Sequence, residues 1–476
     1  MDLDPGLNRA PAEVASVHLM GIGGVAMGAL AGALKRRGLA VRGSDNPLYP
    51  PMSTFLADQQ IPVAPGYDPA NLQPRPDLVI VGNVIRRDNS EVAALAQAGI
   101  PYLSLPQALA EFFIKGRTSI VAAGTHGKTT TTALIASGLL QSDRDPGFLV
   151  GGIMNQGGQN FREGAGKHFV VEGDEYDTAF FDKRPKFVHY LPRIAVLTSV
   201  EFDHADIYDD LEAIRRAFDL LVQEMPADGV LIAWGDSPEV RARVEAAPCP
   251  VLFYGNGEHC QWRLLAAQPA RDGGSRLRVR APGGGELDFH SPLAGEHNAL
   301  NTTACLAALC AAGLSPAQAA EVQQGFGGVK RRQEVLGKAR GVVVVDDFAH
   351  HPTAVRETLG AVREHFPENR LIAVFEPRTH SSMRKVFQQQ YASVFDPADR
   401  ICIREPSLLG KVPEGERLSS RQLVEDLTKR GKDAFHFEDT DGIIDDLTAS
   451  STRGDVILIM SNGGFDNIHE RLLELL

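Results

Sequence analysis

Cysteine is scarce in this sequence, with five residues among 476, and none of the five forms a C-x-x-C pair. An odd number of scattered cysteines predicts neither a disulfide framework nor a zinc site, and it suits a reducing compartment. The chain also lacks any apolar run approaching the roughly 18 residues of a membrane span. Its acidic, proline-containing first dozen residues lack the basic start and apolar middle of a signal peptide. We therefore expect a cytoplasmic protein without membrane association.

Positive charge is also in deficit, because 48 Lys and Arg face 60 Asp and Glu, for a formal net charge of −12. This balance argues against a nucleic-acid or membrane-surface role, although a local basic funnel for an anionic substrate stays possible. Repeats, heptads and low-complexity tracts are absent. The chain is longer than a single hydrophobic core usually supports, so its length predicts about three domains.

The most informative stretch is an apolar run from Ile120 that breaks at glycines and continues as a helix from Ala133 to Leu140. A strand, a glycine turn and a helix N-terminus together form an anion site, because unpaired N–H groups and the helix dipole converge there. A lysine at the helix start suits outer phosphates, and a following threonine suits magnesium. The predicted ATP-binding residues of the loop are Gly124, Thr125, His126, Gly127, Lys128, Thr129 and Thr130. Ala122 stands where the full phosphate-loop pattern has glycine, so a plain strand-to-helix turn is the alternative.

Two acidic clusters follow apolar runs in the same segment. The first contains Glu172, Asp174, Glu175 and Asp177, and the second contains Glu201, Asp203, His204 and Asp206. Ligands of an open α/β sheet collect at the carboxyl ends of its strands, so both clusters should lie beside the phosphate loop. Carboxylates there can hold magnesium, whereas histidine is a less natural magnesium ligand than oxygen. Solvated acidic loops, with a capping or core role for the histidine, are the alternative.

A glycine fingerprint opens the chain after a short strand, Val17 to Met20. Its members are Gly21, Gly23 and Gly24, and the next strand ends at Ser44 and Asp45, where a ribose-binding acid would lie. Taken alone, this pattern supports NAD binding. The same physics serves any diphosphate, a nucleotide-sugar included, and tight helix-on-strand packing is the structural alternative.

The alternation of strands and helices predicts an α/β protein of three domains. We expect a Rossmann-like N-terminal domain at 1–115, a central P-loop ATP-binding domain with a mixed sheet at 116–329, and a Rossmann-like C-terminal domain at 330–476. Glycine-rich turns beyond Asp228 favour an antiparallel excursion in the central domain. The strands expected in the third domain are Val342 to Val345, Leu371 to Phe375, Arg400 to Ile403 and Val456 to Met460.

The order of several motifs resembles that of the Mur ligases of bacterial cell-wall synthesis. The motifs are Gly124-Thr-His-Gly-Lys-Thr129, Glu172-Gly-Asp-Glu175, Asp203-His204, His297-Asn-Ala-Leu-Asn301, Arg331-Arg332 and Asp346-Asp-Phe-Ala-His-His351-Pro. The resemblance covers nearly the whole chain. It implies an ATP-dependent, magnesium-dependent ligase that forms an amide through an acyl phosphate in the bacterial cytoplasm, with no obligate protein partner inferred.

The resemblance also implies roles for individual residues. Lys128 would steady the transferring phosphoryl group, Thr129 and Glu172 would hold one magnesium ion, and His204 would help to hold a second. The further roles are nucleotide binding by Asn298, Arg331 and Asp347, UDP-sugar binding by Gly21, Gly23, Gly24, Ser44 and Asp45, and amine-substrate contacts by Arg378, His350 and His351. A purely structural role for the two histidines is an equal alternative.

The implied substrates are UDP-N-acetylmuramate and the murein tripeptide L-alanyl-γ-D-glutamyl-meso-diaminopimelate, with free L-alanine as the alternative amine. Arg378-Thr379 stands where the alanine-adding relative usually has His-Arg, which favours the tripeptide. Ser199 replaces a frequent family asparagine, and the pattern at Gly21 to Gly24 looks more like the alanine-adding relative. Two other functional classes account for less of the sequence: an NAD-dependent oxidoreductase leaves the phosphate loop unexplained, and a nonenzymatic nucleotide switch leaves the third domain unexplained.

Overall fold

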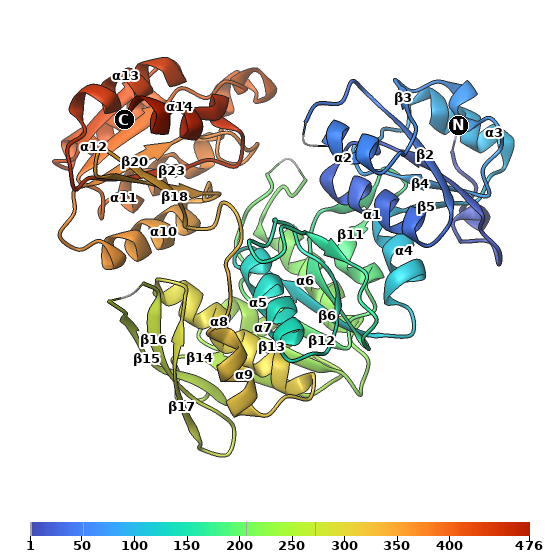
Figure 1. Ribbon diagram of the computed structural model, residues 1–476, viewed down its shortest axis with the longest axis horizontal. Helices are drawn as coiled ribbons and strands as arrows, with labels where there is room; N and C mark the ends of the chain where they lie inside the picture. The colour runs from blue at the N-terminus through green and yellow to red at the C-terminus, as the bar shows by residue number, and fades with distance from the viewer. Residues whose placement is uncertain (1, 51, 206, 272) are drawn as a thin grey trace.

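The computed structural model describes residues 2–50, 52–205, 207–271 and 273–476, so Asp206 of the second acidic cluster lies outside the described residues. Three lobes follow one another along the chain, coloured blue, cyan to yellow, and orange to red in Figure 1. Each of the three large sheets belongs to one lobe. In the part of the chain that the structure describes, every helix is too short or too polar to cross a membrane.

The N-terminal sheet is fully parallel and has the strand order β3-β2-β1-β4-β5. This is the order of a Rossmann-type sheet, in which ligands bind where the order reverses, here between β1 and β4. Its strands are β1 (Ser16–Met20), β2 (Ala40–Asp45), β3 (Val63–Pro65), β4 (Leu78–Val81) and β5 (Tyr102–Ser104). Its helices are α1 (Val25–Arg36), α2 (Met52–Asp58), α3 (Ser90–Ala98) and α4 (Leu105–Leu109).

The central sheet has ten strands in the order β17-β16-β15-β14-β13-β12-β6-β9-β7-β8. The predicted antiparallel excursion is confirmed, since β15, β16 and β17 form an antiparallel meander at one edge. The strands are β6 (Thr118–Ala123), β7 (Gly147–Leu149), β8 (Phe161–Arg162), β9 (His168–Gly173), β12 (Ile194–Leu197), β13 (Val230–Trp234), β14 (Val251–Gly255), β15 (Trp262–Pro269), β16 (Ser275–Arg280) and β17 (Glu286–Ser291). The helices are α5 (Lys128–Gln141), α6 (Leu211–Gln223), α7 (Pro238–Val244), α8 (Glu296–Ala311) and α9 (Pro316–Gln323). A separate hairpin, β10 (Asp177–Ala179) and β11 (Asp182–Pro185), follows the first acidic cluster.

The C-terminal sheet has the order β18-β19-β23-β20-β21-β22, and only β18 is antiparallel. All four predicted strands occur, as β19 (Val342–Asp347), β20 (Leu371–Phe375), β21 (Arg400–Arg404) and β23 (Val456–Met460). The edge strands β18 (Glu334–Ala339) and β22 (Asp433–Phe437) were not predicted, because their partly exposed sequences lack an apolar run. Helices α10 (Pro352–His365), α11 (Gln388–Val394) and α12 (Ser420–Lys429) cover one face, and α13 (Thr440–Ser450) and α14 (Ile468–Leu475) cover the other.

Alternation along β6 shows how the central sheet is built. Ile120 and Ala122 face the core under α5, α8 and α9, whereas Val121 and Ala123 face the core under α6 and α7. Because both faces are covered by helices, the strand is apolar throughout, as buried parallel strands are. The strand therefore ends abruptly at Gly124, where the chain must leave the sheet.

The N-terminal and central domains share one hydrophobic cluster. Phe113, in the segment that joins them, is 1% exposed and packs edge-on against Phe161 of β8 at 5.3 Å between ring centroids. Arg37 at the end of α1 lies over the same ring at 4.3 Å and pairs with Glu163 at 2.6 Å. This interface is an apolar seam closed at its rim by an ion pair.

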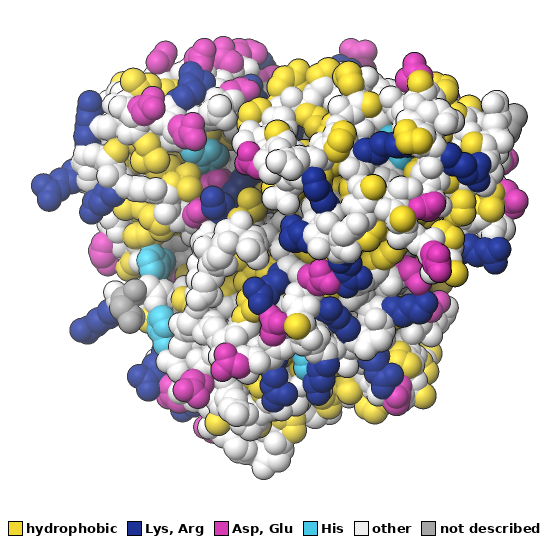
Figure 2. All heavy atoms as spheres, turned by 45° about the vertical axis from the view of Figure 1, so that its right-hand side comes forward, with side chains coloured by type: hydrophobic (Ala, Val, Ile, Leu, Met, Phe, Trp, Pro, Cys, Tyr) yellow, Lys and Arg dark blue, Asp and Glu magenta, His cyan; other side chains and the backbone are white. Residues whose placement is uncertain are grey.

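The contact between the central and C-terminal domains combines hydrogen bonds with an aromatic contact, in which Phe202 packs against Phe387 at 6.4 Å between ring centroids. Helix α10 is the C-terminal helix that faces the central domain in Figure 1. Thr353 at its start donates a hydrogen bond to Glu201 at 2.7 Å, and Ser381 accepts one from the Ala205 N–H at 3.0 Å. Basic and acidic side chains are interspersed over the face drawn in Figure 2, so the net negative charge does not collect on that face.

We expect Phe113→Ala to destabilise the protein by about 3–5 kcal/mol, because it empties a fully buried aromatic site. Thermal unfolding monitored by circular dichroism measures the effect. Tyr49→Ala is the control, since this side chain is 76% exposed and its removal should shift the melting temperature little. Equal shifts in the two variants would contradict the seam as described.

Candidate active site

The loop between β6 and α5 is shaped by two glycines in left-handed conformations. Gly124 has φ +133°, and a Cβ there would lie 2.1 Å from the Thr198 hydroxyl oxygen. Gly127 has φ +80° and caps α5 without any side-chain hydrogen bond. The first N–H groups of α5 therefore lack a side-chain cap, which is the arrangement that binds phosphate at a helix N-terminus. This geometry supports the predicted anion site.

Lys128 lies folded over the loop instead of pointing into solvent. Its ammonium donates to the Gly124 carbonyl at 2.7 Å and pairs with Glu175 at 2.9 Å. Burial alone would lower the pKa of Lys128, but the carboxylates of Glu175 and Asp174 outweigh it and the pKa is raised. The lysine therefore stays charged in a buried position, as a phosphate-binding cation must.

Thr129 and Glu172 form a pair of oxygen ligands at the start of α5. The Thr129 hydroxyl donates to Glu172 at 2.9 Å, and the other Glu172 oxygen accepts the Gly151 N–H at 2.7 Å. Burial and the nearby Asp174 raise the pKa of Glu172. A hydroxyl and a fixed carboxylate are the donor type that Mg²⁺ prefers, so these two residues fit the predicted ion.

His204 contacts the same carboxylate, Glu175, as the lysine does. Its Nε2 is 3.0 Å from Glu175 and 3.9 Å from Asp203, and its backbone is left-handed with φ +55°. Burial lowers the pKa of His204, but these carboxylates outweigh burial and raise it. His204 is therefore held by carboxylates, and a role as a magnesium ligand requires it to give up the contact with Glu175.

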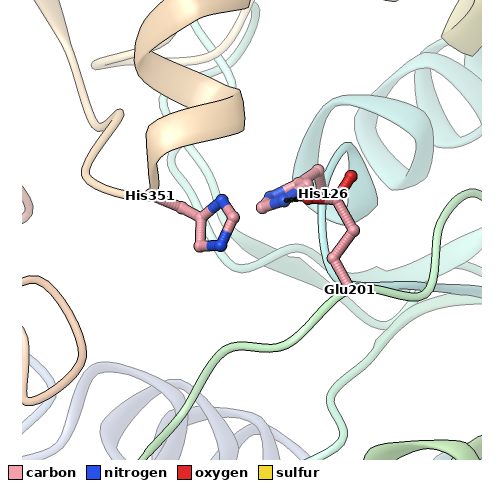
Figure 3. A group of neighbouring side chains, drawn as sticks. All are labelled: His126, Glu201 and His351. Carbon is pink, nitrogen blue, oxygen red and sulfur yellow. Dashed lines mark ion pairs between the residues drawn. The ribbon is translucent and has the colours of Figure 1, made fainter. Parts of the chain in front are cut away.

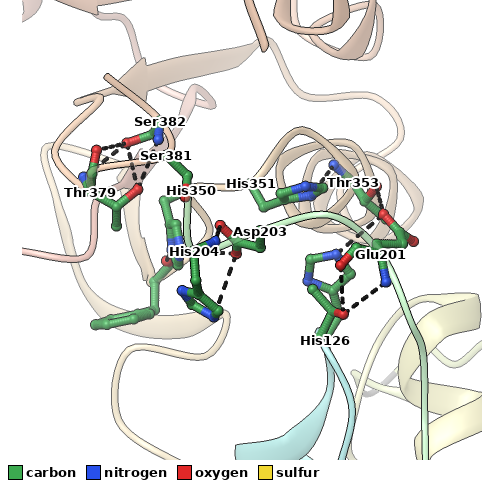
Figure 4. Close-up of polar contacts among 12 residues, drawn as sticks. His126, Glu201, Asp203, His204, His350, His351, Thr353, Thr379, Ser381 and Ser382 are labelled. Carbon is green, nitrogen blue, oxygen red and sulfur yellow. Dashed lines mark hydrogen bonds and ion pairs between the residues drawn. The ribbon is translucent and has the colours of Figure 1, made fainter. Parts of the chain in front are cut away.

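A second group of side chains bridges the phosphate loop and the C-terminal domain (Figure 4). His126 Nε2 is 3.4 Å from Glu201, and its ring lies 4.6 Å from that of His351 between centroids. His351 caps α10 and contacts the Phe202 carbonyl through Nε2 at 3.1 Å. His350 Nε2 lies 4.0 Å from Asp203. Both predicted substrate histidines thus border the central domain.

The three residues expected to bind nucleotide from outside the loop are already engaged in local contacts. Asn298 donates to the Ala294 carbonyl at 2.9 Å. Arg331 donates to the carbonyls of Ser461 and Gly463 at 2.6 and 2.8 Å. Asp347 is buried and accepts the N–H groups of Gln333 and Ala349, both at 2.8 Å. In this structure the three side chains hold nearby backbone segments in place through hydrogen bonds.

Their sequence neighbours lie closer to the loop. Arg332 donates to the Thr129 hydroxyl at 3.2 Å, and a Cβ on Gly127 would lie 2.6 Å from the Asn301 side-chain oxygen. The nucleotide-binding roles of Arg331 and Asn298 stay predictions, and Arg332 and Asn301 are the members of the two motifs that lie against the loop in this structure. Both motifs were recognised from the sequence, but two adjacent arginines or two nearby asparagines cannot be ranked without knowing which one faces the loop.

The N-terminal glycine turn forms as predicted. Gly21 has φ +79°, the Gly23 N–H donates to the Asp45 carboxylate at 2.7 Å, and Gly24 caps α1 without a side-chain bond. The Ser44 hydroxyl is fully buried and donates to Glu91 at 2.6 Å. Its side chain is therefore engaged inside the domain in this structure, and its contact with the UDP-sugar stays a prediction.

Arg378 lies at the carboxyl end of β20 with 32% of its side chain exposed. It passes over Gly463, where a Cβ would lie 2.3 Å from the arginine Cδ, and reaches the buried Glu376 at 3.4 Å. Arg404, which sequence reasoning missed, pairs with Glu376 as well and with Asp466 at 2.7 Å. Arg404 is thus neutralised and buried, which leaves the guanidinium of Arg378 as the more accessible of the two.

Glu175 is the most important residue that the sequence did not single out. It was visible only as one of the four carboxylates of the first acidic cluster, and the sequence does not distinguish these four from one another. Its 1% exposure and its two contacts, to Lys128 and His204, arise only in the tertiary structure.

Comparison with known proteins gives three family matches that together span most of the chain. The Mur ligase family catalytic domain matches residues 16–117, the Mur ligase middle domain matches 122–309, and the Mur ligase glutamate ligase domain matches 331–463.

Similar proteins match over almost the full length. The UDP-N-acetylmuramate–L-alanyl-γ-D-glutamyl-meso-2,6-diaminoheptandioate ligase of Escherichia coli (strain K12) is 39% identical, with 96% of this chain and 97% of the relative covered. The UDP-N-acetylmuramate–L-alanine ligase of Desulfitobacterium hafniense (strain Y51) is 32% identical, with 96% and 99% covered. The crystal structure of a murein peptide ligase from Psychrobacter arcticus 273-4 has a TM-score of 0.71 and 33% identity, covering 97% of this chain and 98% of that one.

Removing the loop lysine should greatly slow ATP-dependent turnover. Lys128→Met alone leaves Glu175 buried without its cation, which can destabilise the fold by about 3–5 kcal/mol. The double variant Lys128→Met/Glu175→Gln removes both charges, and we expect it to fold and to lose about 100- to 1000-fold in turnover. Phosphate release and a melting curve measure the two effects. Lys183→Ala, which removes an exposed lysine of the β11 strand, is the control, and a folded, active double variant would contradict the site.

Proposed function

The chain belongs to the Mur ligase family, and on that premise we propose that it joins UDP-N-acetylmuramate to the tripeptide L-alanyl-γ-D-glutamyl-meso-diaminopimelate in an ATP-dependent reaction. The observation that supports this most directly is the full-length similarity to a ligase named for these substrates, at 39% identity. The family assignment leaves the oxidoreductase alternative without support. The proposed setting is the bacterial cytoplasm, where ATP is available and free cysteines stay reduced.

In this proposal the work is divided among three domains. Residues 1–115 bind UDP-N-acetylmuramate at the turn containing Gly21, Gly23 and Gly24, with Asp45 holding the turn closed. Residues 116–329 bind ATP on the phosphate loop. Residues 330–476 bind the amine substrate and complete the nucleotide site. The hydrogen bonds between the last two domains support this division, because they can open and re-form around substrates.

The proposed reaction needs ATP because a carboxylate is a poor electrophile. A carboxylate resists attack by an amine, so its oxygen first takes the γ-phosphoryl group of ATP and ADP leaves. The amine nitrogen of the tripeptide then attacks the acyl carbon and the amide bond forms. The bond between the acyl carbon and the phosphate oxygen breaks, and inorganic phosphate leaves with that oxygen. The attacking ammonium must lose a proton beforehand.

Negative charge builds on oxygen in both steps, and fixed cations aimed at it supply most of the acceleration. Lys128 is placed to hold the transferring phosphoryl group. Arg332 enters the same space from the C-terminal domain through its bond to Thr129. The proposed magnesium ligands are Thr129 and Glu172, with His204 serving a second ion once it leaves Glu175. When bound, Mg²⁺ would neutralise the negative charge that develops on the phosphate.

His350 is suited to accept the proton that the attacking ammonium must lose. Burial lowers the pKa of His350 and keeps its ring neutral, and its Nδ1 lies 3.0 Å from the Phe348 carbonyl. That bond leaves Nε2, which faces Asp203, as the nitrogen that accepts a proton. His350 is therefore the proposed group that orients the ammonium and takes its proton.

The choice of tripeptide over L-alanine is supported by Arg378. A guanidinium grips a carboxylate through two parallel hydrogen bonds, and the tripeptide carries distal carboxylates that free L-alanine does not have. The identity of 39% to the tripeptide ligase, against 32% to the alanine ligase, points the same way.

Direct competition tests the amine. ATP, UDP-N-acetylmuramate, tripeptide and L-alanine are supplied together, and mass spectrometry identifies the product. We expect the UDP-linked tripeptide to dominate. Consumption of L-alanine at least as efficiently as tripeptide would make the protein an alanine-adding ligase, with the ATP chemistry unchanged.

Arg378→Ala should raise the KM for tripeptide by about 10- to 100-fold, because a charge-assisted hydrogen bond to a carboxylate contributes roughly 1.5–3 kcal/mol. The KM for ATP should change little, since the lost interaction is one of amine binding. Steady-state kinetics with each substrate varied in turn measures both. Arg421→Ala is the matched control, an exposed arginine of the same domain that pairs with Glu438. A KM for tripeptide that stays at the wild-type value would remove Arg378 from the amine site.

A further inference from the structure

His126, Glu201 and His351 converge at the seam between the central and C-terminal domains. One potential ligand atom from each residue lies within 4.8 Å of the others. Figure 3 shows the two imidazole rings facing each other beside the glutamate side chain. We propose that these three residues bind a transition-metal cation of the Zn²⁺ class, at a site separate from the magnesium ligands Thr129 and Glu172.

The distances suit such an ion. In tetrahedral zinc sites the metal lies about 2.0–2.2 Å from nitrogen and oxygen ligands, so neighbouring ligand atoms are about 3.3 Å apart. The His126 Nε2 and Glu201 carboxylate oxygen are 3.4 Å apart. A third ligand atom within 4.8 Å has to approach by no more than about 1.5 Å to complete the triangle. A side-chain adjustment of His351 is sufficient.

The buried Nε2 of His126 lies beside Glu201. The two atoms are 3.4 Å apart, close enough for an ion pair, but among the described residues Nε2 makes no well-formed hydrogen bond. A buried polar atom without a hydrogen bond costs free energy, so such atoms are rare in native structures. The loop backbone that carries His126 is fixed, since the His126 N–H donates to the Ser199 hydroxyl at 2.9 Å and the carbonyl accepts from Thr198. A cation between Nε2 and the Glu201 carboxylate would give this nitrogen a partner.

His351 already has the outer-shell contact typical of a metal-binding histidine. Its Nε2 lies 3.1 Å from the Phe202 carbonyl, and a proton on that nitrogen leaves the lone pair on Nδ1. At present this lone pair accepts the Thr353 N–H at 3.2 Å, the capping bond of α10. A metal ion would take over the lone pair at the cost of about one capping interaction, roughly 1 kcal/mol.

Two of the three side chains have shifted pKa values. Burial and the neighbouring His126 lower the pKa of His351 to about 3. Burial would raise the pKa of Glu201, but His126 and the Thr353 hydroxyl outweigh it and hold the pKa at about 2. Ligands must be deprotonated before they coordinate, and both shifts favour the metal-binding forms of these two side chains.

The ligand set selects against magnesium. Two imidazoles and one carboxylate suit Zn²⁺ and its neighbours, whereas Mg²⁺ prefers oxygen ligands throughout. Because the ligands come from the phosphate loop, the segment after β12 and the N-cap of α10, a bound ion would hold two domains together. The inference does not depend on the proposed reaction, since it concerns metal binding by the protein alone.

Isothermal titration of the full chain with Zn²⁺, in excess Mg²⁺ and without nucleotide, tests the site. The main variant is His351→Asn, because asparagine keeps the α10 cap and removes the imidazole. Asp236, His259 and Cys260 form the other described group with metal-ligand spacing, so His259→Asn is the matched control. We expect His351→Asn to weaken one Zn²⁺ equivalent by at least tenfold, since loss of even an outer-shell partner costs about 10- to 100-fold. His259→Asn should retain that equivalent.

Unchanged Zn²⁺ binding in a folded His351→Asn protein, or loss of the equivalent in His259→Asn alone, would overturn the proposal. If His351→Asn fails to fold, Glu201→Gln decides, with tenfold weaker binding supporting the site and wild-type binding refuting it. The absorption spectrum of Co²⁺ in place of Zn²⁺ adds a readout of nitrogen ligation. Failure of ligase activity would leave all these measurements unaffected, so the two proposals fail separately.

Discussion

The buried ion pair between Lys128 and Glu175 is the constraint on which the catalytic region depends. A lysine at a helix N-terminus would be repelled by the helix dipole and penalised by burial, so it needs a carboxylate close by. Glu175 provides it at 2.9 Å and simultaneously holds His204 at 3.0 Å. One carboxylate therefore fixes the positions of two basic side chains before any phosphate binds. A phosphate that binds can then replace Glu175 as the anion beside Lys128.

Much of this arrangement could be predicted from the sequence, because the rule that ligands collect at strand ends needs only strand positions. The apolar run before Gly124 located the phosphate loop, and the runs before Glu172 and Glu201 located two further loops beside it. All three strands are neighbours in the sheet, with β6 between β9 and β12. The edge strands β18 and β22 were not predicted, because they are partly exposed and their sequences lack a continuous apolar run.

Contacts between domains could not be predicted in the same way. Arg331 and Arg332 are adjacent and chemically identical, and in the folded chain Arg332 reaches Thr129 while Arg331 bonds to the carbonyls of Ser461 and Gly463. Ser44 presents the same difficulty, since it ends a strand at the ligand edge but turns inward to Glu91. Sequence patterns give the position of a residue along a strand, whereas side-chain direction at a loop depends on tertiary packing.

The apolar seam at Phe113 and the polar contacts at α10 have different consequences for how such a protein diversifies. A shared hydrophobic cluster tolerates change poorly, because each altered side chain leaves a cavity or an overlap in both domains at once. Hydrogen bonds such as Thr353 to Glu201 can be broken and made again with little loss. The third domain is therefore the exchangeable module: an ancestral chain could acquire a new amine specificity by remodelling residues beyond 330 while the first two domains were inherited as one unit.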